Sequence, residues 1–252
     1  MYAEERRQEI ALLVRQNGRG DVTELAERFE VTPETIRRDL TDLERSGTLR
    51  RVHGGAIPIE RFRPEPAVAE KMGLMSKEKR QIASAALAFV PQEGTVLLDA
   101  GTTTLALAQI FPDRDLTAFT TASPLALELA TRSRVRLYLI GGRVRRRTLA
   151  HVGDWALRQL ADLQVEVAFV GTNGLSVARG LSTPDPAEAA VKGAMCQAAL
   201  QVVVLADHTK IGQEDAVRFA SIEDVDALVT DAGLAPSDRE ALEEAGVEVV
   251  LA

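Results

Sequence analysis

Over its first 45 positions the chain places apolar side chains three or four residues apart, the spacing of a helix with one buried face. Two segments share this pattern: Ile10, Leu13 and Val14, and then Val22, Leu25, Ala26 and Phe29. Asp21 directly precedes the second segment and Glu24 follows Asp21 by three residues, an arrangement typical of a capping box. The pattern therefore predicts two short helices.

A third helix is predicted from Pro33 to about Arg45. Thr32 can cap it, and Pro33 fits the first turn, where a missing N–H costs nothing. The buried stripe consists of Ile36, Leu40 and Leu43, and the opposite face carries Thr35, Arg37, Arg38, Thr41 and Asp42. A strand at 49–52, a turn at 53–55 and a returning strand at 56–57 follow. This order predicts a helix-turn-helix with a two-stranded wing.

Further along, the pattern changes to short, continuously apolar runs between helical segments. The predicted strands are 95–98, 116–120, 135–140, 165–170, 202–206, 227–230 and 247–251, with helices at 76–90, from 123, around 155, at 187–200 and before the last strand. Continuous apolar strands alternating with helices indicate a parallel sheet covered on both faces. The loop from Gly171 to Pro186 is expected to connect a strand to a helix. Pro58, Pro64 and Pro66 break regular structure between the two parts.

We therefore predict an α/β protein with three parts: a winged helix-turn-helix domain at 1–57, a linker at 58–75 and a larger α/β domain at 76–252. The 252 residues are 46% hydrophobic and 27% charged, which is ordinary for a folded globular protein. The single cysteine, Cys196, allows no intrachain disulfide. The first 20 residues lack the apolar core of a signal peptide, and no apolar run approaches the roughly 20 residues of a membrane helix. We expect a cytoplasmic protein without a membrane partner.

Charge is distributed unevenly along the chain. The net charge is −7, which taken whole argues against a nucleic-acid binder. Residues 1–57, however, hold ten Arg and eleven acidic residues, and the stretch from Arg45 to Ala56 contains Arg45, Arg50, Arg51 and His53 but no acid. A local basic surface is what contact with phosphates needs. Charge alone leaves open whether this is a DNA-docking surface or a solvated loop.

Polar loops follow several of the predicted strands, at the edge where open α/β sheets bind ligands. The run Asp99-Ala100-Gly101-Thr102-Thr103-Thr104 comes after the first strand and opens a helix. Unpaired amides and the helix dipole favour an anion there, and a phosphate is the natural guest. An ordinary helix cap remains the alternative.

Other strand ends add candidate ligand-binding residues. They are Thr120, Thr121 and Ser123 after the second strand, Gly141 and Gly142 after the third, Gly171, Thr172, Asn173 and Gly174 after the fourth, and Asp207, His208, Thr209 and Lys210 after the fifth. Lys210 would neutralise a phosphate. Glu188 and Lys192 lie four apart on a helix, so they belong either to the site or to a surface ion pair.

Catalytic or metal-binding constellations are poor. The three histidines, His53, His151 and His208, are scattered, and no His/Cys cluster has metal-ligand spacing. Cys196 and Trp155 are expected in the core. The run Arg143, Arg145, Arg146 and Arg147 is a solvated loop by default, with an anion site or a subunit contact as alternatives. We predict no catalytic residue, metal or cofactor.

Two sets of residues resemble a known family, the DeoR/GlpR-type bacterial transcriptional regulators. The first set is Thr35-Ile36-Arg37-Arg38-Asp39-Leu40, Leu43-Glu44, Gly47, Leu49 and Arg51-Val52-His53-Gly54-Gly55-Ala56. The second is Leu98-Asp99-Ala100-Gly101-Thr102-Thr103-Thr104, Gly141-Gly142, Ala168-Phe169-Val170-Gly171, Glu188 with Lys192, and Asp207 with Lys210-Ile211-Gly212. The resemblance covers essentially the whole chain.

The resemblance implies a regulator, usually a repressor, that leaves its operator when a phosphorylated sugar binds the second domain. It also implies a sensor fold similar to ribose-5-phosphate isomerase. Where many members have Thr-Asn-Ser, this chain has Thr121-Ala122-Ser123, which removes an amide from the edge of the site. The expected effector-binding residues are Asp99, Gly101, Thr102, Thr103, Thr104, Thr120, Ser123, Gly141, Gly142, Gly171, Asn173, Gly174, Glu188, Lys192, Asp207 and Lys210.

The third helix is expected to enter the major groove of double-stranded operator DNA. The expected contacts are Thr35, Arg37 and Arg38 on that helix and Arg50, Arg51 and His53 on the wing. One such domain covers a half-site, so a homo-oligomer, dimer or tetramer, is expected. Two alternatives remain: a sugar-phosphate isomerase carrying a DNA-binding head, with Asp99, Glu188 and Lys210 as acid–base groups, and an activator built from the same parts.

Overall fold

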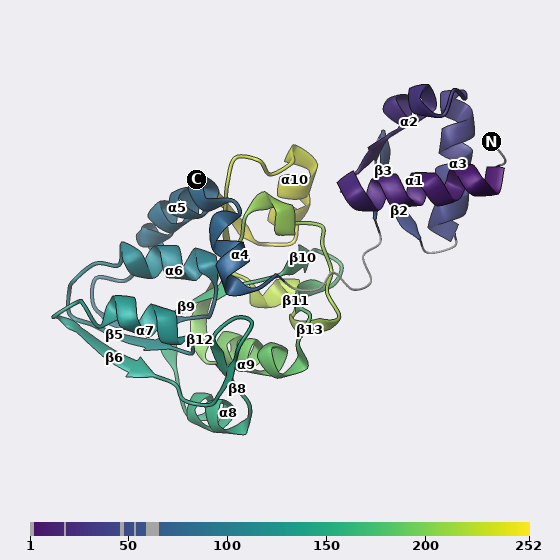
Figure 1. Cartoon of the computed structure of the whole chain (residues 1–252). Helices are drawn as coiled ribbons and strands as arrows, with labels where there is room; N and C mark the ends of the chain where they lie inside the picture. Colours follow the sequence, from purple (N-terminus) through teal and green to yellow (C-terminus); the bar gives the residue numbers. More distant parts are fainter. Residues whose placement is uncertain (1–2, 18, 46–47, 53, 59–65) are drawn as a thin grey trace. The chain divides into compact units, whose positions relative to one another are not determined.

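The computed structural model describes residues 3–17, 19–45, 48–52, 54–58 and 66–252. The chain divides into two compact units, Met1–Arg63 and Pro64–Ala252, and each is described by itself (Figure 1). His53 and Gly47, which sequence analysis assigned to DNA contact and to the family motif, lie outside the described residues.

The first unit contains three helices and a small sheet. The elements are α1 (Ala3–Asn17), β1 (Gly20–Asp21), α2 (Val22–Arg28), α3 (Pro33–Arg45), β2 (Leu49–Val52) and β3 (Gly55–Pro58). Asp21 caps α2 as predicted, because its carboxylate accepts hydrogen bonds from the amides of Thr23 and Glu24. Thr32 caps α3, and its hydroxyl accepts from the amide of Thr35 at 3.2 Å.

The wing has three strands rather than the predicted two. β1 pairs antiparallel with β3, and β3 pairs with β2, in the order β1-β3-β2. Two residues are too few to give a strand signal, so β1 was not visible in the apolar pattern. A Cβ on Gly55 would lie 2.1 Å from the carbonyl oxygen of Gly20, so the close approach of β1 and β3 requires glycine at this position. The predicted stripe of α3, Ile36, Leu40 and Leu43, is buried in the core of this unit.

The second unit is a doubly wound α/β domain, as predicted. Its seven parallel strands run in the order β15-β14-β12-β9-β4-β5-β6. They are β4 (Gly94–Leu98), β5 (Leu116–Thr120), β6 (Val135–Leu139), β9 (Val165–Gly171), β12 (Ala199–Leu205), β14 (Ala227–Thr230) and β15 (Glu248–Leu251). Most residues of the central strands β4, β9, β12 and β14 are buried, which explains their continuous apolar runs.

Helices cover both faces of this sheet (Figure 1). They are α4 (Val68–Gly73), α5 (Ser76–Ala86), α6 (Thr102–Gln109), α7 (Ser123–Leu129), α8 (Asp154–Ala161), α9 (Pro186–Gln197) and α10 (Pro236–Glu244). α5, α6 and α7 pack in sequence on one face, and α8 and α9 pack against each other on the other face. α4 lies within the segment predicted as a linker. None of the described helices is both long and apolar enough to cross a membrane.

Five short strands lie outside the main sheet, and the apolar pattern did not predict them. β7 (Arg143–Arg145) and β8 (Ala150–Val152) form a hairpin, and β10 (Gly174–Ser176), β11 (Gly180–Thr183) and β13 (Val217–Ala220) form a small antiparallel sheet. β10 and β11 occupy the stretch expected to be a loop. The hairpin follows β6 and the small sheet begins after β9, and Arg145 and Thr148 of the hairpin contact the site described next.

Candidate functional site

The first candidate site is the exposed face of α3 and the wing. Two acidic side chains of α3 face α1 instead: Asp39 is buried and pairs with Arg6 at 2.6 Å, and Asp42, which sequence analysis placed on the outer face, pairs with Arg7 at 2.7 Å. These ion pairs fix α3 on α1. Asp39, an acid of the family motif, therefore has a structural role, which sequence analysis did not assign to it.

The predicted DNA-contacting side chains of α3 lie on its outer face. Arg37 and Arg38 are exposed, and Arg37 makes a 3.2 Å ion pair with Glu34 across one helical turn. Such exposed pairs contribute little, so DNA phosphate or base groups can replace Glu34 at small cost. No partner for the Arg38 guanidinium is found within the described ranges. Thr35 is half-buried and its hydroxyl lies 2.9 Å from that of Thr32.

The wing arginines project next to α3. Nη1 of Arg51 donates to the hydroxyl of Thr41 at 3.0 Å, and the amide of Arg51 donates to Glu44 at 2.9 Å. Arg50 is exposed on the same strand. The wing is thus tied to α3 by side-chain bonds, and its basic residues lie beside the outer face of that helix.

The second candidate site lies at the carboxyl edge of the parallel sheet. Strands β4, β5 and β6 follow one another in one direction, whereas β9, β12, β14 and β15 follow in the other, so the strand order reverses between β4 and β9. A crevice at this switch point is where open α/β sheets bind ligands. Asp99 comes directly after β4 and Gly171 is the last residue of β9, and the amide of Gly171 donates to the Asp99 carboxylate at 2.9 Å.

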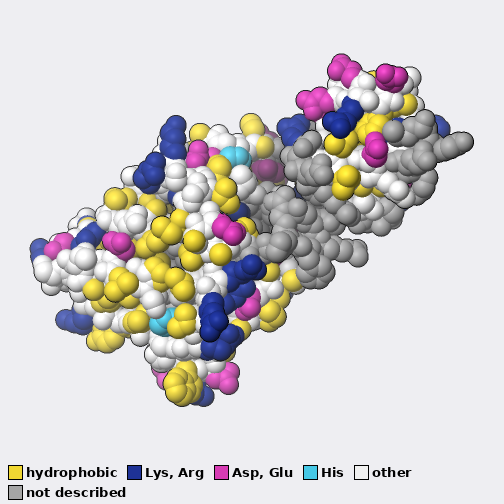
Figure 2. Space-filling view, in the orientation of Figure 1, with side chains coloured by type: hydrophobic (Ala, Val, Ile, Leu, Met, Phe, Trp, Pro, Cys, Tyr) yellow, Lys and Arg dark blue, Asp and Glu magenta, His cyan; other side chains and the backbone are white. Residues whose placement is uncertain are grey.

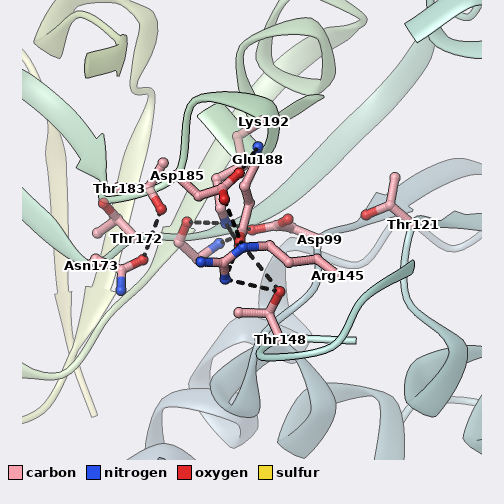
Figure 3. A network of polar contacts seen from close by, with 12 residues as sticks. Asp99, Thr121, Arg145, Thr148, Thr172, Asn173, Thr183, Asp185, Glu188 and Lys192 are labelled. Atoms are coloured by element: carbon pink, nitrogen blue, oxygen red, sulfur yellow. Dashed lines mark hydrogen bonds and ion pairs between the residues drawn. The ribbon is translucent and has the colours of Figure 1, made fainter. Parts of the chain in front are cut away.

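A buried network of charged side chains is built on this pair (Figure 3). The Lys192 ammonium, on α9, donates to the Asp99 carboxylate and, at 2.9 Å, to the carbonyl of Gly171. Glu188, one turn earlier on α9, has a carboxylate oxygen 4.0 Å from the same ammonium. Lys192 and Glu188 are 2% and 3% exposed, so the surface-pair alternative is excluded.

Arg145 extends this network from the β7–β8 hairpin. Its guanidinium lies 3.0 Å from Glu188 and 3.0 Å from Asp185, the residue that caps α9. The hydroxyl of Thr148, in the turn of the hairpin, donates to Glu188 at 3.3 Å. The default interpretation of the arginine run as a solvated loop was therefore wrong for Arg145. Its neighbours Arg143, Arg146 and Arg147 are exposed, and Lys and Arg side chains gather in the region of β8 and α9 in Figure 2.

The electrostatics of the network follow from its composition. Burial alone would lower the pKa of Lys192, but the carboxylates of Asp99 and Glu188 outweigh it and hold that pKa above its ordinary value. Burial would raise the pKa of Asp185, but the Glu188 amide and Arg145 lower it on balance. With all five groups ionised, three carboxylates and two cations leave a net charge of −1. Such a network is suited to accept hydroxyl donors and is poorly suited to a phosphate dianion.

A more suitable anion site is the start of α6, next to Asp99. Gly101 caps this helix without a side-chain bond, and within the described part of the chain no acceptor is found for the amides of Thr102, Thr103 and Thr104. Three amides at a helix N-terminus form a ready anion site. Thr104 is buried and its hydroxyl donates to the Gly101 carbonyl at 3.0 Å, whereas Thr102 is half-buried.

Asp207 follows β12 and caps the short helix His208–Lys210, in which Lys210 is the last residue. Asp207 is buried and accepts from the amide of Thr209 at 3.2 Å and from its hydroxyl. Lys210 is half-buried, and its ammonium has no hydrogen bond or ion pair to any described residue. It is thus a cation at this edge that carboxylates do not neutralise.

Other predicted effector-binding residues have structural partners of their own. The amide and carbonyl of Gly141 bond the Gln159 side chain, each at 3.2 Å, and a Cβ on Gly142 would lie 2.8 Å from the carbonyl oxygen of Val152. Thr120 is buried and donates to Leu98 at 2.8 Å. These contacts give all three residues a structural role that needs no bound ligand.

The loop after β9 is similarly occupied. Asn173 accepts from the hydroxyl of Thr183 at 3.2 Å, and the carbonyl of Gly174 accepts from the hydroxyls of Thr172 and Ser182. A Cβ on Gly174 would lie 2.5 Å from the carbonyl of Gln213. The loop is fixed in place beside the Lys192 network, as Figure 3 shows.

Ser123 begins α7, and its hydroxyl lies 2.8 Å from Nε2 of His151, whose Nδ1 lies 2.8 Å from the carbonyl of Ile140. His151 is buried on β8, a strand that sequence analysis missed. The pair stands beside Ala122, where the family pattern has an asparagine.

Cys196 and Trp155 were both expected in the core, but only Cys196 is buried. Cys196 is buried, and burial raises the pKa of its thiol to about 12, so it is no nucleophile. Trp155 is 69% exposed on α8, so its placement in the core was wrong. The spacing of α8 put Trp155 near its apolar face, but Ala156 and Leu160 fill the contact with the sheet.

The fold and the two sites define a class of protein: a DNA-binding head joined to a doubly wound sensor domain. Residues 6–62 match the DeoR-like helix-turn-helix domain, and residues 75–232 match the DeoR C-terminal sensor domain. The chain belongs to the DeoR family and is a DNA-binding transcriptional regulator.

Two relatives in sequence and one solved structure illustrate what this chain is similar to. The HTH-type transcriptional regulator GlpR of Haloferax volcanii is 38% identical over 251 residues, 99% of this chain and 98% of that protein. The HTH-type transcriptional repressor GlcR of Bacillus subtilis is 30% identical over 252 residues, 100% of this chain and 98% of that one. Ribose 5-phosphate isomerase A of Methanocaldococcus jannaschii aligns with a TM-score of 0.40 and 15% identity, over 54% of this chain and 55% of that chain.

Proposed function

We propose that this regulator is a repressor of a sugar-metabolism operon and that a phosphorylated sugar releases it from its operator. The observation that carries the proposal is the division of the carboxyl edge into two parts. One part is the start of α6, which no side chain caps, together with Lys210, whose ammonium is paired with no carboxylate of the described residues. The other is the carboxylate-rich network of Glu188 and Asp185. A phosphate suits the first part and sugar hydroxyls suit the second.

The orientation of the effector follows from charge. A phosphate beside Glu188 and Asp185 would be repelled, whereas the α6 amides offer it hydrogen-bond donors. Asp185 is the most accessible carboxylate of the network, with 28% of its side chain exposed. In this pose the sugar hydroxyls donate to Asp185 and Glu188 and compete with Arg145 for them.

The DNA contacts are proposed for the outer face of α3 and the wing. Arg38 reads a base edge, because its guanidinium has no partner among the described residues, and Arg37, Arg50 and Arg51 contact phosphates. Since one head covers one half-site, a homo-oligomer binds a two-fold operator. Relatives named as regulators support regulation, rather than isomerisation, as the role of the sensor domain.

The DNA part is tested by selecting an operator from random 40-bp duplexes and measuring affinity at several salt concentrations. Arg38→Ala should weaken binding by about tenfold and relax the preference at one base pair. Arg51→Ala should weaken binding to all DNA sequences alike and reduce the slope of log affinity against log salt concentration by about one. Arg28→Ala, an exposed arginine on α2, is the control and should change neither. Equal binding by Arg38→Ala and the parent would overturn the assignment.

The effector part is tested with five probes: glycerol 3-phosphate, fructose 1-phosphate, tagatose 6-phosphate, galactose 1-phosphate and deoxyribose 5-phosphate, each beside its unphosphorylated form. One phosphorylated compound should raise the melting temperature, because binding to the folded state stabilises it by mass action. Lys210→Ala should abolish the shift, and Lys77→Ala, an exposed lysine on α5, should not. Shifts that do not depend on the phosphate would contradict the proposal.

A further inference from the structure

The helix α4 is the first described element after the boundary between the two units. The first unit ends at Arg63, and α4 begins at Val68. Any signal that passes along the chain from the sensor domain to the DNA-binding unit passes through this helix. How α4 is attached to the sensor domain therefore bears on how the effector acts.

Apolar packing holds α4 only weakly. None of its residues is buried. Met72, near its end, and Leu74, the residue that follows the helix, are both more than half exposed. A segment with little buried apolar surface opens at low free-energy cost unless other contacts hold it. In α4 those contacts are polar, and they lie at its two ends.

The first contact ties the start of α4 to the β7–β8 hairpin. The amide of Val68 donates to the carbonyl of Arg147 at 2.8 Å. Arg147 lies between Arg145 and Thr148, the two residues of the hairpin that hold Glu188. A movement of Arg145 away from Glu188 would therefore displace the acceptor of the Val68 amide.

The second contact ties the end of α4 to α5. Lys79 is 7% exposed, and its ammonium donates to the carbonyls of Lys71 and Leu74 at 2.5 and 2.6 Å. Carbonyls at the end of a helix lack partners within it, and a cation there is favourable. Met75 joins the two helices with a φ of 52°, a conformation that non-glycine residues keep only where surrounding contacts hold them.

Lys79 is also within electrostatic range of the predicted effector site. Burial lowers its pKa, the Asp207 carboxylate raises it, and the Lys210 ammonium lowers it, with a net decrease. An anion arriving beside Lys210 therefore attracts the Lys79 ammonium, in competition with the carbonyls of Lys71 and Leu74 at the end of α4.

We propose that α4 is the coupling element of the regulator: the Val68–Arg147 bond and the Lys79 ammonium hold it in the state that binds operator, and the effector releases both ends together. Sugar hydroxyls draw Arg145 away from Glu188 at one end, and the phosphate draws Lys79 at the other. This inference rests on the proposed function for the identity of the effector. Lys79, Arg147 and Val68 act as positioning residues.

The first test removes a single amide. Val68→Pro deletes the donor without interrupting the helix, because proline is tolerated at the first helical position and Ala67 already has the extended backbone that precedes a proline. Val68→Ala keeps the amide and is the matched control. In the full-length protein without any sugar, Val68→Pro should weaken binding to the selected operator about fivefold, the equivalent of one hydrogen bond. It should also speed hydrogen exchange of residues 69–75.

The second test uses Lys79→Met, which keeps the apolar stem and removes the charge, with Lys77→Met as control. The variant should bind operator less tightly and lose most of its response to the active probe among the five phosphates. By reciprocity of coupling, its affinity for that probe should stay equal to the parent's or rise. A variant that had only damaged the effector site would instead bind the probe less tightly.

The outcomes separate the two proposals. If none of the five phosphates binds, the proposed effector fails, and the Val68→Pro comparison still decides the role of α4. If Val68→Pro matches Val68→Ala in operator affinity and in exchange, α4 is not the coupling element. Loss of probe binding by more than tenfold in Lys79→Met would make Lys79 a direct effector contact and would also overturn the proposal.

Discussion

The two units use charge in opposite ways. In the DNA-binding unit, acids pair with arginines along the contact between α1 and α3, while Arg37, Arg38 and Arg50 remain exposed. In the sensor domain, Asp99, Glu188 and Lys192 are buried together at the switch point of the sheet. An exposed charge binds a partner and adds little to stability, whereas a buried charge is costly once its partner is removed. Substitutions in the two units should therefore separate binding from folding.

The largest effect is expected for Lys192→Met, which leaves Asp99 and Glu188 buried without their shared cation. Breaking a buried pair costs about 3–5 kcal/mol, because the remaining charge is uncompensated. The free energy of unfolding from urea titration checks this value. Arg239→Met, which breaks an exposed pair with Glu243, is the control and should cost about 0.5 kcal/mol or less. If both variants lowered the free energy of unfolding by the same small amount, the buried charges of the sensor domain would not be more costly to unpair than exposed ones.

A smaller effect is expected within the DNA-binding unit itself. Asp39→Asn removes the charge that holds Arg6 in a largely buried pair, so it should cost about 2 kcal/mol. Asp42→Asn, in a more exposed pair with Arg7, should cost less than about 1 kcal/mol. Chemical unfolding of the full-length chain, followed by exchange at α3 amides, measures both. A larger cost for Asp42→Asn would contradict the structural role given to Asp39.

The smallest effects are expected from pH. The pKa of Asp231 is lowered, since hydrogen bonds from His208 and Gly233 outweigh burial, and the pKa of Asp185 is lowered as well. Depressed carboxyl pKa values add stability above their ordinary value of 3.8, and this stability is lost as pH falls below it. The raised pKa of Lys192 adds stability that is lost only as pH rises above 10.5.

Thermal unfolding from pH 2 to 11 should therefore show a plateau between these limits. Asp231→Asn should flatten the acid side and leave the alkaline side unchanged. An acid slope that is identical in the parent and in Asp231→Asn would show that this carboxyl does not contribute.

The elements with periodic or continuously apolar sequences could be predicted, because the positions that are buried must carry apolar side chains. Strand β5 has the predicted bounds, 116–120. The short strands β1, β7 and β8 have two or three residues each, too few for a pattern, so their positions depend on pairing with distant segments. Asp99 was predicted from the polar loop after its strand, and Lys192 was left open between the site and a surface pair until the family resemblance favoured the site; the structure adds that the two side chains touch.

Other site residues could not be predicted. Arg145 was singled out with its neighbours, but four arginines among the five residues 143–147 do not show which one faces inward. Only the hairpin register, with Arg145 opposite Ala150, turns it toward Glu188. Lys79 gave no signal, because an isolated lysine on an amphipathic helix is ordinarily exposed.

The most direct test of the central claim is the affinity for the selected operator, measured with and without each of the five phosphorylated sugars and its unphosphorylated form. We expect one of the five phosphorylated compounds to weaken operator binding by at least about tenfold, the scale of a typical coupling between sites. The unphosphorylated form should have no effect. Unchanged affinity with all five, or equal weakening by the unphosphorylated sugar, would contradict the claim.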